Sequence, residues 1–293
     1  MANNFAEKTA QALEELGASL KSVFKIATTK RGTVKPLTNR GRSDKNRRTL
    51  IVLGNGPSLR QNIENDLEIL QSNDTLAVNF AANAQEFTLL KPKFYVLADP
   101  HFFTNLSDPN VERLIGNLNK IDWPMTLFVP SSARMSAGLI SNRFIKTERF
   151  AFVATEGFRW FEDFAFDHGL GMPRPRNVLV PAIMSGAWMG YDEIYLLGAD
   201  HSWMKTLSVS DDNRVVTVQP HFYKEDEKEV ERIKEVYVGR KLHEVIESFH
   251  IAFKAYHTIE RWAASRHIEI YNATPGSMID AFKRRNISKL KNS

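Results

Sequence analysis

The chain has 293 residues and no cysteine. Disulfide bonds, cysteine-based metal sites and cysteine nucleophiles are therefore excluded. No apolar run approaches the roughly 20 residues that span a bilayer. Acidic residues stand near the N-terminus, where a signal peptide has its apolar stretch. We therefore expect a cytoplasmic protein that does not cross a membrane.

Several common catalytic motifs are missing as well. The sequence has no Gly-x-Ser-x-Gly elbow, which disfavours a serine hydrolase. It has no HExxH and no Asp-x-Asp pair, so we expect no bound metal. We therefore expect the protein to bind a substrate and to have no resident cofactor.

Positive charge is concentrated near the two ends of the chain. The net charge is +5, and residues 30–48 hold a run of lysines and arginines with Asp44 as the only acid. A second basic cluster lies between Lys283 and Lys291. Two interpretations stay open, a solvated linker and tail or a contact with the inner face of the membrane. Nucleic acid is disfavoured, because no aromatic residues interleave with the basic ones.

The first 48 residues read as an extension of the main domain. Apolar residues between Phe5 and Ile26 recur at helical spacing, which predicts an amphipathic helix over residues 5–26. Three roles stay open for this helix: packing on the body, pairing with another subunit in a homo-oligomer, or lying on a membrane. Residues 27–48 lack apolar periodicity and read as a basic linker.

The rest of the chain alternates between strands and helices. Expected strands are 49–53, 75–79, 93–98, 126–129, 149–153, 193–197 and 268–272, with helices over 182–189 and 242–266 and a short one after Pro275. This alternation predicts an α/β, Rossmann-like and mostly parallel sheet with helices on both faces. We assign residues 49–286 to this catalytic domain, 201–240 to a lid-like polar insertion and 287–293 to a basic tail.

The clearest local motif is GNGPSL at Gly54–Leu59, directly after the first strand. Gly54 and Gly56 allow a tight turn and close approach of a ligand. Ser58 then lies in the first turn of a helix whose N–H groups favour a phosphate. With Asn55, these residues predict a nucleotide site. The alternative is a plain strand-to-helix turn.

Other candidates follow from the rule that ligands bind beyond the carboxyl ends of the strands. They are the residues just past those ends, together with a Ser-Gly pair in the helix that precedes the sixth strand. The set comprises Asn79, Asp99, Ser185, Gly186, Gly198, Asp200 and Thr274. For Asp200, a capping role is the alternative.

Histidine is the expected general base, because its pKa lies near neutrality. We choose His221 in the insertion, with Tyr223 beside it as a candidate helper. His243, at the start of the long helix, is the second choice. For His221, the alternative is a loop histidine exposed to water. For His243, it is packing or capping, because His243, His250 and His257 share one face of the long helix.

Together these segments resemble a known family. GNGPSL, Asn79, Ser185-Gly186, GYDEIYLLGAD (190–200) and YNATPGS (271–277) are similar to the bacterial sialyltransferases of glycosyltransferase family 42. They also resemble the motility-accessory-factor flagellin glycosyltransferases and the archaeal 6-hydroxymethylpterin pyrophosphokinase-like group. The likeness spans residues 49–282 in short segments.

The resemblance implies a metal-independent, inverting transfer of a sialic-acid-like nonulosonic sugar. The donor is a CMP-activated sugar and the acceptor a surface glycan. By position, Gly54, Asn55, Gly56 and Ser58 border the phosphate and ribose, and Asn79 binds the donor. Ser185, Gly186 and Gly198 line the cytidine side.

The chain also departs from that family. Asp99 stands where the family has Asn, and His201-Ser202-Trp203 stands where its tyrosines assist phosphate departure. Two alternatives therefore stay open: an ATP- and magnesium-dependent pyrophosphokinase-like enzyme, with Asp99 and Asp200 on the metal, and a non-catalytic nucleotide-binding module.

Overall fold

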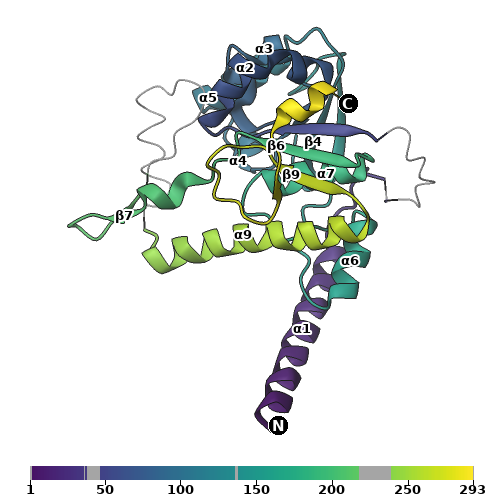
Figure 1. Cartoon of the computed structure of the whole chain (residues 1–293), viewed down its shortest axis with the longest axis vertical. Helices are drawn as coiled ribbons and strands as arrows, with labels where there is room; N and C mark the ends of the chain where they lie inside the picture. The colour runs from purple at the N-terminus through teal and green to yellow at the C-terminus, as the bar shows by residue number, and fades with distance from the viewer. Residues whose placement is uncertain (1, 36, 38–46, 136–137, 218–238, 293) are drawn as a thin grey trace.

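The computed structural model describes residues 2–35, 37, 47–135, 138–217 and 239–292 (Figure 1). Its centre is an eight-stranded sheet in the order β10-β9-β6-β1-β2-β3-β4-β5, and every neighbouring pair is parallel. The strands are β1 Thr49–Leu53, β2 Asp74–Val78, β3 Phe94–Val96, β4 Met125–Pro130, β5 Ile145–Phe150, β6 Glu193–Leu197, β9 Glu269–Asn272 and β10 Lys283–Arg284. The predicted α/β, Rossmann-like fold is confirmed.

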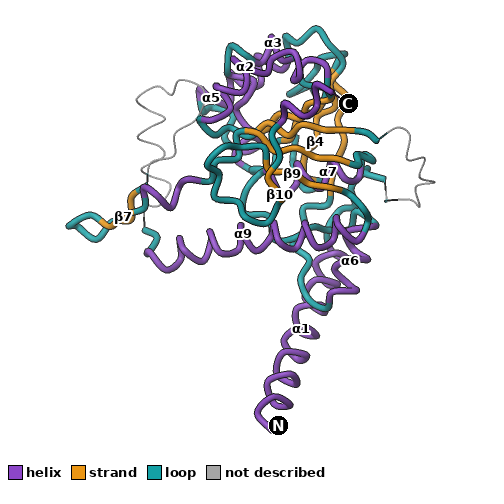
Figure 2. The backbone as a smooth tube through the Cα atoms, in the orientation of Figure 1, coloured by secondary structure: helices purple, strands orange, loops and turns teal. Residues whose placement is uncertain are grey.

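Helices cover both faces of this sheet (Figure 2). The described helices are α1 Ala2–Thr28, which projects away from the sheet, α2 Ser58–Ser72, α3 Phe87–Leu90, α4 His101–Thr104, α5 Pro109–Leu118, α6 Arg159–Asp167, α7 Leu179–Trp188 and α9 Leu242–Ser265. The described 3₁₀ turns are η1 Asn79–Asn83, η2 Ser202–Thr206 and η3 Ile287–Asn292. The alternation of side chains along β1 shows how the two layers form. Leu50 and Val52 join the core with α7 and α9, whereas Ile51 and Leu53 join the core with α2.

The strand order reverses beside β1. From β1 the chain proceeds to β2, β3, β4 and β5 on one side, and then returns to place β6, β9 and β10 on the other. Leu53 at the end of β1 pairs in register with Leu197 of β6 and Ala77 of β2. The chain thus leaves β1 and β6 toward opposite sides of the sheet, and open α/β sheets bind ligands at such a reversal of strand order.

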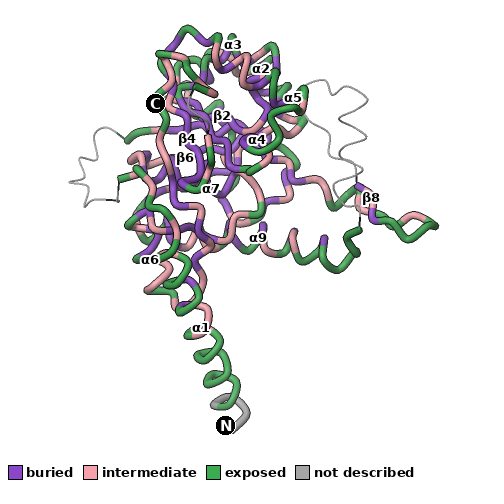
Figure 3. The backbone as a smooth tube through the Cα atoms, turned by 180° about the vertical axis from the view of Figure 1, so that it is seen from behind, coloured by how far each residue is buried: buried purple, intermediate pink, exposed green. Residues whose placement is uncertain are grey.

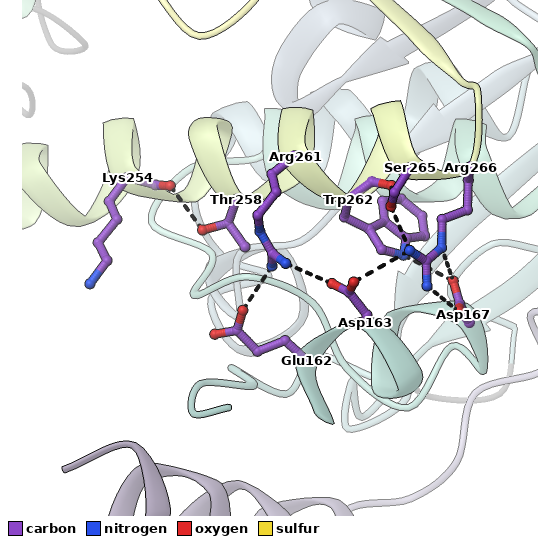
Figure 4. Close-up of polar contacts among 9 residues, drawn as sticks. All are labelled: Glu162, Asp163, Asp167, Lys254, Thr258, Arg261, Trp262, Ser265 and Arg266. Carbon is purple, nitrogen blue, oxygen red and sulfur yellow. Dashed lines mark hydrogen bonds and ion pairs between the residues drawn. The ribbon is translucent and has the colours of Figure 1, made fainter. Parts of the chain in front are cut away.

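An ionic cluster fastens α6 to the C-terminal end of α9 (Figure 4). Arg261 pairs with Glu162 and Asp163 at 2.9 Å each, and Arg266 reaches Asp167 at 2.6 Å. The Trp262 indole N–H also donates to Asp167, at 3.0 Å. These bonds fix one end of α9, whose other half contributes to the cavity described below.

The structure corrects the sequence-based elements at several places. The strand expected at 149–153 lies earlier, at Ile145–Phe150. The helix expected after Pro275 is wrong, because that stretch forms a turn, β10 and the 3₁₀ turn η3. The insertion contains a short hairpin, β7 Ser208–Val209 with β8 Val215–Val216. Residues 218–238 of the expected lid-like insertion lie outside the described residues.

The N-terminal helix is present as predicted and projects from the body (Figure 1). The described part of the expected linker is not free of contacts, however. The backbone N–H groups of Thr33 and Leu37 donate to Arg149 and Asp167, and Val34 packs on the core. Across the described ranges, no helix combines the length and hydropathy needed to cross a bilayer.

Candidate active site

A cavity of about 650 Å³ lies at the carboxyl ends of β1, β2, β3 and β6. Its walls come from the loops after these strands, the start of α7 and one face of α9. Of the expected residues, the cavity is lined by Gly54, Asn55, Gly56, Asn79, Asp99, Gly198 and Asp200. The crevice beside β1 is therefore a real hollow of the size that a small-molecule ligand needs.

Three glycines bring the loops after β1 and β6 into backbone contact. Gly54 N–H donates to Leu197 O at 2.7 Å, and Gly56 N–H donates to Gly198 O at 2.8 Å. A Cβ atom on Gly54 would lie 2.4 Å from the Gly198 carbonyl oxygen. Gly198 also has φ +61°, a conformation that favours glycine. The GNGPSL glycines thus allow the close contact between the two loops.

Asp200 occupies the N-terminus of α2. Its Oδ2 accepts a hydrogen bond from Ser58 Oγ at 2.8 Å. Burial raises the pKa of the Asp200 carboxyl, and hydrogen bonds from the side chain and backbone of Ser58 oppose that rise. A carboxylate in this position accepts hydrogen bonds at the start of α2 and interacts favourably with the helix dipole. It therefore lies where the sequence predicts a phosphate. The alternative of a capping role for Asp200 is therefore the one that the geometry favours.

Two asparagines present unpaired oxygen atoms. The Asn55 amide donates to Val78 O at 3.3 Å, and its Oδ1 is buried without a hydrogen-bond partner. Asn79, held at φ 51°, also has a buried Oδ1 without a partner. Such orphaned acceptors are rare in folded proteins. Both residues line the cavity, so a ligand with N–H or O–H donors would satisfy them.

A third amide, Asn177, is fixed by a buried chain of hydrogen bonds. His201 Nε2 lies 2.6 Å from the Tyr256 hydroxyl, which donates to Asn177 Oδ1 at 2.8 Å. Burial lowers the pKa of His201 to about 3 and raises that of Tyr256, so both rings stay neutral. The Tyr256 proton points to Asn177, so His201 must carry its proton on Nε2.

These hydrogen bonds use the Asn177 side-chain oxygen and leave its amino group for a ligand. Asn177 Oδ1 also accepts from Leu179 N–H at 2.9 Å, at the first residue of α7, whereas its buried Nδ2 has no partner. The adjacent Arg176 is exposed and lines the cavity, as does Arg240. A helix start, an amide donor and the Arg176 guanidinium group make this wall suited to an anion.

His101, which also lines the cavity, pairs with the carboxylate of Asp108. His101 Nε2 is 2.9 Å from Asp108 Oδ2, and Asp108 Oδ1 accepts from Asn110 N–H at 2.8 Å. Asp99 Oδ1 accepts from the His101 backbone N–H at 2.8 Å. Asp108 thus orients the imidazole through Nε2 and leaves Nδ1 for another partner. In the described ranges, no three metal-ligating side chains gather in one place.

Several expected site residues lie elsewhere. Ser185 and Gly186 are buried near the end of α7, and a Cβ on Gly186 would meet Leu50 and Ile194, so they pack against the sheet and do not line the cavity. Thr274 is buried and bonds to Ala199 N and Leu196 O. Ser58 faces Asp200. His243 is exposed and does not line the cavity, and His221 and Tyr223 fall outside the described residues.

Sequence reasoning missed Arg176, Asn177 and the His101–Asp108 pair. The helix expected from the sequence begins at Ala182, whereas α7 begins at Leu179, because Pro181 obscures the start. Pro is tolerated in the first turn of a helix, and Asn177 before an apolar run is a start signal that was available. The His101–Asp108 contact depends on how α4 and α5 pack, so no local pattern reveals it.

Comparisons with known proteins give a likeness in fold. No protein-family model and no curated protein matches the sequence. Among solved structures, the MAf glycosyltransferase of Magnetospirillum magneticum AMB-1 is similar, with a TM-score of 0.51 and 11% identity. The match covers 94% of this chain but 39% of that protein. The resemblance to motility-accessory-factor proteins is thus supported at the level of the fold.

The contact between Gly54 and Gly198 predicts that two glycine-to-alanine substitutions differ in their effect on stability. In Gly198→Ala, the new Cβ would lie 2.7 Å from Gly54 O and 2.9 Å from Leu59 Cβ. We expect the free energy of unfolding to fall by about 1–3 kcal/mol. Gly116→Ala in α5 is the control, because no atom lies within 4 Å of its Cβ. It should leave stability unchanged or raise it by up to about 1 kcal/mol. Equal effects in urea unfolding would contradict the contact.

The buried His201 predicts a specific dependence of stability on pH. Its pKa is depressed on folding, so its contribution is full above the unfolded value of about 6.5 and declines as pH falls toward the folded pKa of about 3. Between pH 6.5 and 5, the wild type should lose about 2 kcal/mol more than His201→Gln, which keeps a donor. If the difference in unfolding free energy between the wild type and His201→Gln is constant over this range, His201 takes up a proton in the folded state.

Proposed function

We propose that this chain is a glycosyltransferase. It moves a nonulosonic, sialic-acid-like sugar from a CMP-activated donor to a surface-glycan acceptor, with inversion and without a metal. The observation that carries the proposal is the wall at the start of α7, where Arg176 and Asn177 line the cavity and the buried Asn177 Nδ2 has no hydrogen-bond partner. The fold likeness to a MAf glycosyltransferase supports it.

The donor phosphate binds at Arg176 and Asn177, not at the Gly54–Ser58 turn. The Asp200 carboxylate already occupies the N-terminus of α2 and would repel a phosphate there. At α7 the guanidinium and the amide donor stabilise the negative charge that grows on CMP as it leaves. The unpaired oxygens of Asn55 and Asn79 accept from the amino or hydroxyl groups of the nucleoside.

The base on the described part of the chain is His101. Nδ1 takes the proton of the acceptor hydroxyl as its oxygen bonds to the anomeric carbon of the sugar. The bond between that carbon and the phosphate oxygen breaks, and CMP departs with the electron pair. Asp108 keeps Nε2 protonated and stabilises the imidazolium that forms. His221, with Tyr223 beside it, is the competing base and is tested beside His101.

The proposed donor site predicts that the protein binds CMP selectively. CMP should raise the melting temperature of the protein with or without Mg²⁺, because ligand binding stabilises the fold by mass action. Arg176→Ala should abolish most of the shift. Arg174→Ala, two residues away and outside the cavity lining, should preserve it. A shift produced by ATP alone and requiring Mg²⁺ would favour the pyrophosphokinase-like alternative, with Asp99 and Asp200 on the metal.

A second prediction concerns the base. With a CMP-activated nonulosonic acid as donor, His101→Gln should lower kcat by about 10²–10⁴-fold and leave the CMP-induced thermal shift intact. His257→Gln is the control, because His257 forms a similar pair with Asp280 on an exposed surface. If His221→Ala lowers kcat and His101→Gln does not, the base lies in the insertion. CMP binding without turnover of the donor would indicate a binding module.

A further inference from the structure

Helix α1 carries a stripe of large apolar side chains that the body leaves uncovered. The exposed fractions are 64% for Leu13, 45% for Leu16, 62% for Leu20, 49% for Val23 and 70% for Phe24. Figure 3 shows exposure along most of the helix, which extends away from the sheet. A cluster of this kind marks an interaction site on a soluble protein.

The stripe is separate from the side of α1 that contacts the body. Ser22 Oγ donates to Glu156 O at 2.8 Å, and Phe158 N–H donates to Ser19 Oγ at 2.9 Å. Both serines are buried. At about 100° per residue, the apolar stripe lies roughly a third of a turn round the helix from these serines. The body therefore holds α1 in place and leaves the stripe facing outward.

The spacing of the stripe is that of a coiled-coil seam. Leu13, Leu16, Leu20 and Val23 are separated by three, four and three residues, the a and d positions of a heptad. Ala6, Thr9 and Ala27 continue the same spacing toward both ends of the helix. The flanking e and g positions are uncharged along this length: Ala10, Ala12, Gly17, Phe24 and Ile26, with the g position Ser19 held against the body. Two such helices meet without like-charge repulsion.

The charges of α1 fit a second helix better than a lipid surface. The acids Glu7, Glu14 and Glu15 are balanced by the bases Lys8, Lys21 and Lys25. Helices that lie on anionic membranes carry a polar face rich in lysine and arginine. On α1, Glu7 and Glu14 share the polar side with Lys21 and Lys25, so this face gains little from anionic headgroups.

We propose that two copies of this chain associate through α1, with Leu13, Leu16, Leu20 and Val23 forming a shared apolar seam. The pairing buries these side chains from both copies and leaves the cavity at the carboxyl ends of the strands open. The proposal is independent of the chemistry in that cavity.

Sedimentation equilibrium of the full chain tests it. The wild type should have twice the mass of one chain at micromolar concentration, and Leu16→Lys with Leu20→Lys should have the mass of one chain. Glu7→Gln with Glu14→Gln changes the net charge of the helix by the same amount on its polar side and should remain a dimer. A monomeric wild type, or a dimer that persists in the double-lysine variant, would overturn the proposal.

Cross-linking supplies a test that keeps the seam largely intact. The chain has no cysteine, so Leu20→Cys and Leu16→Cys, oxidised separately and as a mixture, report contacts of the seam alone. A covalent dimer in any of these samples supports pairing, whether the helices run parallel or antiparallel. No covalent dimer, together with cosedimentation on phosphatidylserine vesicles that requires Leu16 and Leu20, would assign the stripe to a membrane instead.

Discussion

The backbone contact between the loops after β1 and β6 sets the geometry of the whole site. Gly54 and Gly56 donate to Leu197 O and Gly198 O, and the space between these loops has no room for a Cβ atom. The contact brings Asp200 to Ser58, where its carboxylate fills the N-terminus of α2. The start of α7, where His201 and Tyr256 hold Asn177, is the place at which we propose that an anion binds.

Much of the fold follows from the sequence. Strands such as Thr49–Leu53 and Glu193–Leu197 are short buried apolar runs, and burial on both faces of a parallel sheet demands that pattern. The long helix from Leu242 is also predicted within a residue or so of its bounds. The β5 strand is poorly predicted, because its exposed edge carries Lys146, Thr147 and Glu148 and lacks a continuous apolar run.

The site is harder to predict, because its chemistry depends on pairs of residues far apart in the chain. The strand-end rule correctly brings Gly54, Asn79, Asp99 and Gly198 to one cavity. It cannot show that Asp200 caps α2, since that contact joins residues 142 positions apart. The expected helix start at Ala182 is too late, so the sequence places Ser185 and Gly186 in the first turns of the helix, whereas they lie in its last turn.

A crystal structure of the protein with CMP tests the central claim most directly. The account predicts the phosphate against Arg176 and Asn177 Nδ2 at the start of α7, with the nucleoside extending toward Asn55 and Asn79. Asp200 should keep its hydrogen bond to Ser58. A phosphate bound at the Gly54–Ser58 turn, with Asp200 displaced, would contradict the account, as would CMP bound outside this cavity.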